Sequence, residues 1–254
     1  MRKVQHYIHE IEKALKAEFA SDKKAKYKDL KKYIGTQYDF IGLSVPTQRK
    51  VFKNGCSIEA FPFDEQLKIW DAIWKESNLF EVLSQCLYFI KKHVRKADPK
   101  VIWKITRQWV PKVDNWVHSD ELSDIFSLLL ERETELIFSQ LQKWNTSSNP
   151  WERRQSLVAM VGNGRKGKKL LPVDTLLDMI ENVLEDEDYF VQKGVGWLLR
   201  ETGNVYSKET YRFLKENIIV LHPVAFTAAT EKIAAAQKDE LKSLRKSRLK
   251  KKAG

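Results

Sequence analysis

The sequence predicts an all-α protein built from repeated helix pairs, and three observations support this fold class. Glycine and proline are scarce, with 10 and 7 copies among 254 residues, and Lys, Leu, Glu and Ala are abundant. Apolar residues recur at the spacing of amphipathic helices. Segments that begin with an aromatic residue follow one another at nearly constant intervals, which is typical of a helical repeat.

The helices can be placed in order along the chain. Two amphipathic helices are expected over 2–20 and about 23–36, followed by a turn at Gly42. Pro46 can open the next helix, because a proline at the first helical position sacrifices no hydrogen bond. Further helices are expected at about 46–54, 64–75, 79–95, 98–109, 132–143, 173–185, 207–219 and 222–237.

An internal repeat begins at residue 80. Its helices start with Phe80, Trp116, Trp151 and Phe190, at spacings of 36, 35 and 39 residues. Each is preceded by another helical segment, so the repeating unit is a helix pair of HEAT-like length. Such pairs stack into a solenoid with a concave and a convex side. We therefore predict one repeat domain over 1–237, followed by a basic C-terminal tail over 238–254.

The formal net charge of +11 is concentrated near the C-terminus. Residues 238–252 hold eight lysines and arginines against Asp239 and Glu240, which accounts for six of the eleven excess charges. A basic run of this kind favours nucleic acid or acidic surfaces, and its simpler interpretation is a solvated helix end. The sequence between residues 162 and 169 adds a flexible basic loop between repeats, without the ending of a phosphate-binding P-loop.

Membrane insertion and disulfide bonding are not expected. No segment has the roughly 18 uninterrupted apolar residues of a membrane span, and the N-terminus lacks an apolar signal core. Cys56 and Cys86 lie far from any CxxC arrangement. A chain of this size does not depend on a disulfide bond for its stability, so we expect two reduced thiols in a cytoplasmic protein.

The most informative stretch runs from Asp188 to Glu201. On a helix, its residues Lys193, Trp197 and Arg200 share one face, while apolar residues lie towards another. Two glycines inside this stretch each cost a helix about 1 kcal/mol relative to alanine, so either a neighbour packs closely or a ligand approaches there. A cationic, aromatic face suits a polyanion. The structural alternative places the tryptophan in the core and the arginine in solvent.

Superposing the repeats brings further polar residues to the same side of the predicted solenoid. They include Ser119, Asp120, Arg154 and Lys193. A carboxylate repels phosphate, so the acid at position 120 is a candidate for chemistry and not for DNA binding. Trp116 lies four residues before it, so both side chains project from one helix face.

This arrangement suits cleavage of an N-glycosidic bond. As the base leaves, the sugar becomes an oxocarbenium ion, which a nearby carboxylate stabilises while it orients or deprotonates the incoming water. Indole faces favour a cation by roughly 0.5–2 kcal/mol each. A base made cationic by alkylation leaves as a neutral molecule and needs no general acid, so one carboxylate is sufficient.

Each of these residues also has a structural interpretation. Asp120, with Ser119, can accept hydrogen bonds near a helix start, and Trp116 can belong to the core. Asp114 is a rival carboxylate whose simpler role is that of a helix cap. His118 is either a phosphate or water contact or a partly exposed surface histidine. No arrangement of histidines and cysteines supports a metal site, and no cofactor is expected.

Four segments carry a resemblance to a known family. They are Lys32-Tyr33-Ile-Gly-x-x-Tyr-x-Phe40-Ile-Gly42-Leu-x-x-Pro46-x-x-Arg49, Trp116-x-x-Ser-Asp120, Trp151-x-x-Arg154 and Gln192-Lys193-Gly-Val-Gly-Trp197-Leu-Leu-Arg200-Glu201. In that order they resemble the bacterial DNA alkylation repair family, the AlkD type of HEAT-like-repeat DNA glycosylases. The resemblance spans nearly the whole chain, and its last segment is the most specific.

The resemblance implies a C-shaped solenoid that holds duplex DNA in a basic concave groove and excises cationic purines such as 3-methyladenine and 7-methylguanine. The base would leave without being flipped into a deep pocket. Asp120 would be the catalytic acidic residue, between aromatic walls formed by Trp116 and Trp197. The residues expected to contact DNA are Tyr33, Arg154, Lys193 and Arg200.

We therefore expect a monofunctional DNA glycosylase that acts as a monomer on duplex DNA containing alkylated bases. No lysine is assigned as a Schiff-base nucleophile, so base loss should occur without strand cleavage. Two other classes remain open. One is a non-catalytic solenoid that binds bent, branched or damaged DNA through charge and shape. The other is a protein–protein scaffold, which the recurrence of cations on one face disfavours.

Overall fold

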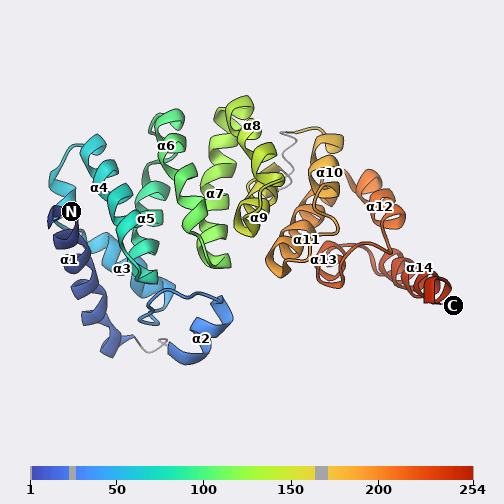
Figure 1. Ribbon diagram of the computed structural model, residues 1–254, viewed down its shortest axis with the longest axis horizontal. Helices are drawn as coiled ribbons and strands as arrows, with labels where there is room; N and C mark the ends of the chain where they lie inside the picture. The colour runs from blue at the N-terminus through green and yellow to red at the C-terminus, as the bar shows by residue number, and fades with distance from the viewer. Residues whose placement is uncertain (1, 23–26, 164–170, 254) are drawn as a thin grey trace. The chain divides into compact units, whose positions relative to one another are not determined.

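The computed structural model describes residues 2–22, 27–163 and 171–253, and helices account for most of them (Figure 1). These residues contain no β-strand, and the extended pairing among them is an isolated bridge between Asp39 and Leu79. The predicted all-α helical-repeat fold is confirmed. Among the same residues, no helix is both long enough and apolar enough to cross a membrane.

The chain divides into two compact units, which we call unit 1 (Met1–Ile125) and unit 2 (Phe126–Gly254). The α-helices that begin in unit 1 are α1 (Arg2–Glu18), α2 (Tyr27–Ile34), α3 (Val45–Asn54), α4 (Phe63–Glu76), α5 (Phe80–His93), α6 (Pro99–Thr106) and α7 (Trp116–Arg132). Those of unit 2 are α8 (Thr134–Asn145), α9 (Pro150–Val158), α10 (Val173–Glu181), α11 (Tyr189–Gly203), α12 (Ser207–Glu216), α13 (Pro223–Ala229) and α14 (Ala235–Ala253).

The predicted repeat coincides with the observed helix starts. Helix α5 begins at Phe80 and α7 at Trp116. Helices α9 and α11 each begin one residue earlier than expected, so that Trp151 and Phe190 occupy their second positions. Another helix precedes each of the four in the chain, as the helix-pair repeat requires.

Helix α5 is the centre of unit 1. Its residues 80–90 are all buried, and it packs against α1, α3 and α4 (Figure 1). The carboxylate of Glu81, inside this core, accepts hydrogen bonds from the backbone N–H groups of Ile41 (3.1 Å), Gly42 (2.7 Å) and Leu43 (3.3 Å). Burial raises the pKa of Glu81, and the three N–H donors act in the opposite direction. The extended segment before α3 is therefore held to α5 by one side chain.

Several expected helices end earlier than predicted, among them those expected over 98–109, 173–185, 207–219 and 222–237. Helix α6 stops at Thr106, and a 3-10 helix continues to Lys112, because Pro111 lacks an N–H group and its ring would clash with the carbonyl four residues earlier. The helix expected over 222–237 ends at Ala229, and α14 starts separately at Ala235. The basic loop predicted at 162–169 begins in a short 3-10 helix, and residues 164–170 lie outside the described residues.

Helix α11 is the centre of unit 2 and packs against α9 on one side and α13 on another. Its two glycines play different parts. A β-carbon at Gly196 would lie 2.7 Å from the carbonyl oxygen of Ala225 and 2.7 Å from the β-carbon of Ala228, both in α13. A β-carbon at Gly194 would meet its nearest neighbour, a methyl group of Val158, at 3.4 Å. Close helix packing therefore explains Gly196, and no ligand is needed to account for it.

Alanine substitutions at the two glycines should have different effects on stability. We expect Gly196→Ala to lower the free energy of unfolding by about 1–3 kcal/mol, since the α13 backbone has to shift. Gly194→Ala should leave it unchanged or raise it by up to about 1 kcal/mol, because alanine is the better helix former and the space is available. Urea denaturation of the two variants measures the difference. Equal stabilities would contradict this account of the α11–α13 contact.

Candidate functional site

The start of α7 is organised by Asn115 and Asp114. The side-chain oxygen of Asn115 accepts a hydrogen bond from the N–H of His118 at 2.9 Å, so Asn115 is the helix cap. The carboxylate of Asp114 accepts instead from the Thr36 hydroxyl (2.9 Å), the Gln37 N–H (2.7 Å) and the Asn115 amide (2.8 Å). The predicted capping role of Asp114 is wrong, because these contacts use the carboxylate to hold the loop after α2. An asparagine directly before the helix was the signal for the cap.

His118 is neither a phosphate contact nor a surface histidine, so both expectations for it are wrong. Its imidazole is fully buried and stacks on Phe80, with ring centroids 4.3 Å apart. The Asn115 amide lies 3.1 Å from Nδ1 and the Ser84 hydroxyl 3.1 Å from Nε2. Since an amide nitrogen can only donate, Nδ1 accepts and Nε2–H donates to Ser84. Burial lowers the pKa of His118 to about 3, so the ring is neutral at physiological pH.

Trp116 and Tyr33 form an aromatic pair at the surface of unit 1. The indole Nε1–H of Trp116 donates to the backbone carbonyl of Tyr33 at 3.2 Å. The two rings meet edge to face with centroids 5.5 Å apart. Trp116 is half-buried and Tyr33 is 69% exposed. The structure therefore brings together two of the predicted site residues, and a hydrogen bond fixes the orientation of the indole.

Asp120 lies in the second turn of α7, four residues after Trp116, so the two side chains project from one face of the helix. The carboxylate-bearing residue is half-buried, whereas the neighbouring Ser119 is fully buried. Asp120 is therefore partly accessible to a ligand, whereas Ser119 is not. Its catalytic role stays a prediction.

In unit 2, Arg154 links two helices. Its side chain is buried, with the residue only 3% exposed, and Nη1 donates to the carbonyl of Phe190 at 2.7 Å. The aliphatic part of the side chain lies against Gly194 of α11. Little of the guanidinium is left for a phosphate in this conformation. The predicted contact of Arg154 with DNA stays a prediction, and these contacts show that the residue also positions the start of α11.

The predicted binding face of α11 contains residues of differing exposure. Lys193 is exposed, and Trp197 is half-buried. The guanidinium of Arg200 forms ion pairs with Glu201, at 3.1 Å, and with Glu231. Because α11 is helical from residue 189 to 203, the three predicted residues lie along one side of it, as expected. Arg200 has two carboxylate partners, whereas the exposed Lys193 is the more available cation for a phosphate.

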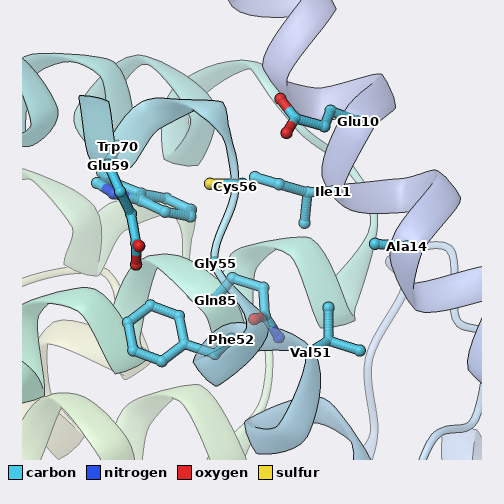
Figure 2. A pocket seen from close by; sticks show the side chains of 10 residues that line it. All are labelled: Glu10, Ile11, Ala14, Val51, Phe52, Gly55, Cys56, Glu59, Trp70 and Gln85. Carbon is cyan, nitrogen blue, oxygen red and sulfur yellow. The ribbon is translucent and has the colours of Figure 1, made fainter. Parts of the chain in front are cut away.

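A small cavity in unit 1 is not part of this candidate site. It has a volume of about 50 Å³, and Figure 2 shows its lining residues, which include Cys56, Trp70 and Gln85 and come from α1, α3, α4, α5 and the segment after α3. Pockets for drug-sized ligands have roughly 300–1,000 Å³, so this cavity has room for water and not for a nucleobase. Burial raises the pKa of Cys56 to about 11, and both cysteines are free thiols. The described part of the chain has no cluster of His, Cys, Asp or Glu that could hold a metal ion.

The family model described as DNA alkylation repair enzyme matches residues 11–233. The chain belongs to this family. A solved structure described as a predicted DNA alkylation repair enzyme from Enterococcus faecalis is similar, with a TM-score of 0.68 and 18% sequence identity. The similarity covers 84% of this chain and 99% of the other, and at this identity it supports the fold. No protein of curated function matches the sequence at a significant level. Membership of the family supports a role in DNA repair, with DNA as the substrate.

Proposed function

We propose that the protein is a monofunctional DNA glycosylase that hydrolyses the N-glycosidic bond of cationic alkylated purines in duplex DNA. The observation that carries this proposal is the placement of Trp116 and Asp120 on one face of α7, beside the exposed ring of Tyr33. An acid on the same helix face as an indole is poorly suited to holding phosphates but well suited to a developing cation.

The proposed reaction begins with breakage of the bond between the sugar and a positively charged base such as 3-methyladenine or 7-methylguanine. The bonding electrons leave with the base, which becomes neutral, and the sugar becomes an oxocarbenium ion. The Asp120 carboxylate stabilises this ion, orients the water that attacks it and accepts the proton that the water loses. The indole of Trp116 contributes a further stabilisation of the cation, and its hydrogen bond to Tyr33 keeps the ring in position.

The experiment that tests the proposal measures release of free 3-methyladenine or 7-methylguanine from methylated duplex DNA. We expect base release that leaves the DNA strand intact until the abasic sites are cleaved with hot alkali. A protein that binds branched or damaged duplexes tightly but releases no base would instead be the non-catalytic alternative. Strand cleavage concurrent with base loss would contradict the monofunctional mechanism.

Lys193 is proposed to contact a DNA phosphate from the exposed face of α11. We expect Lys193→Gln to weaken binding to all duplex sequences alike and to reduce the slope of log affinity against log salt by about 0.9, the value for one lost phosphate contact. Fluorescence anisotropy at several salt concentrations measures the slope. Lys208→Gln removes another exposed lysine, from α12, and should leave the slope unchanged. Identical slopes for both variants and the unmodified protein would exclude this contact.

A further inference from the structure

Helix α14 (Ala235–Ala253) lies outside the part of the chain that matches the family model, which ends at residue 233. It is nevertheless attached to unit 2 as a regular helix. Leu241 is completely buried, and Glu240 accepts a hydrogen bond from the Tyr211 hydroxyl at 2.8 Å and pairs with Lys215 at 2.6 Å. Because Tyr211 and Lys215 belong to α12, these contacts join the two helices.

A second group of contacts determines which face of α14 points inwards. Nη2 of Arg245 donates to the carbonyl of Leu221 at 2.7 Å, and its guanidinium lies over the ring of Phe226, 5.0 Å from the centroid. Since Leu241 and Arg245 are four residues apart, both mark the same inner face. The rotation of the helix about its axis is therefore defined, and the exposed Lys242, Lys246 and Lys250 are directed away from this contact.

The outer side of α14 carries a row of cations. Lys242, Lys246 and Lys250 are exposed and follow one another at intervals of four residues, or about 6 Å along the helix axis. Lys242 forms one ion pair, with Asp239 at 3.4 Å, and both of its members are well exposed, so the pair is weak. The sequence has no acidic residue after Glu240. Within the described residues, Lys246 and Lys250 form no ion pair, so the row keeps most of its positive charge.

We propose that this lysine row binds the phosphate backbone of duplex DNA, as a contact independent of base sequence and additional to the family's repeat domain. The regular spacing of cations on a docked helix complements a regularly spaced polyanion. A membrane surface is the poorer partner, since an interfacial helix needs an apolar face. In α14, Leu241 is buried, Leu244 is half-buried, and Leu249, at 43%, is the large apolar residue exposed on the described part of the helix.

The test compares two triple variants that remove the same charge. Lys242→Gln, Lys246→Gln and Lys250→Gln together should weaken binding to an unmodified duplex roughly 10- to 100-fold near 0.1 M salt and reduce the salt slope by up to about 2.7. The control variant, with Lys68→Gln, Lys104→Gln and Lys143→Gln, removes exposed lysines from α4, α6 and α8. It should change the slope by less than about 1.

Circular dichroism of both variants establishes that the helices still form. Equal affinities and slopes for the two variants would overturn the proposal. Binding of the unmodified protein to phosphatidylserine vesicles, lost in the α14 variant while its DNA affinity stays unchanged, would also overturn it and identify a membrane surface as the partner. Because the probe is undamaged DNA, the outcome does not depend on glycosylase activity and can be read even if no base is released.

Discussion

Replacing Asp120 by asparagine should reduce the rate of base release from methylated DNA by about 10²–10³-fold, while DNA binding stays equal or becomes tighter. Asparagine has nearly the same shape but no charge, so it removes the stabilisation of the oxocarbenium ion that the carboxylate is proposed to supply. In the proposed complex, loss of this negative charge removes a repulsion of the phosphates, so DNA binding is not expected to weaken. The rate of base release under single-turnover conditions and the affinity for an unmodified duplex measure the two effects separately.

Asp124 provides a matched control for this experiment. It lies one turn further along α7, and its carboxylate pairs with Lys91 at 3.0 Å. Asp124→Asn should therefore keep base release within a few-fold of the unmodified protein. If Asp120→Asn and the unmodified protein released bases at the same rate, Asp120 would have no catalytic role. If both aspartate variants lost activity equally, the loss would be caused by destabilisation of α7 and not by removal of a catalytic group.

Acidification should destabilise the protein through His118. Burial lowers the pKa of this histidine to about 3 in the folded chain, whereas an unfolded histidine titrates near 6.5. Below about pH 6.5 the unfolded chain binds a proton that the folded chain does not accept. The free energy of unfolding should therefore fall by about 1.4 kcal/mol for each pH unit between about 6.5 and 3, and be unaffected by this group above that range.

Urea denaturation at a series of pH values, for the unmodified protein and two variants, tests this expectation. His118→Gln removes the titrating group, so its stability should depend less steeply on pH over the same interval, although it will be less stable at neutral pH. Ser84→Ala removes the hydrogen-bond partner of Nε2 but keeps the imidazole. It should lower stability at every pH without changing the slope. A His118→Gln variant with the same slope as the unmodified protein would show that His118 is not the acid-sensitive group.

Much of the helical architecture was predictable because its signals are local. Periodicity over a dozen residues located the helices, and the aromatic residue at the start of each repeat located Phe80 and Trp116 to the residue. The relation between Trp116 and Asp120 is also local, since a separation of four residues on a helix puts two side chains on one face. Several helix ends were predicted less accurately. The end of α6 follows from Pro111, a local signal that the prediction did not use, whereas no glycine or proline marks the break after Ala229.

The sequence by itself determined the fold class and the helix pairs, because both follow from the spacing of residue types along a helix, and it supplied the residues of the candidate site as a prediction. Only the tertiary structure decided that Asp114 holds a loop, that His118 is buried and neutral, and that Gly196 makes room for α13. The physical reason is distance along the chain. Apart from the neighbouring Asn115, the partners that decide these roles are 29 to 78 positions away in the sequence, so burial and hydrogen bonding there depend on packing between helices that no local pattern specifies.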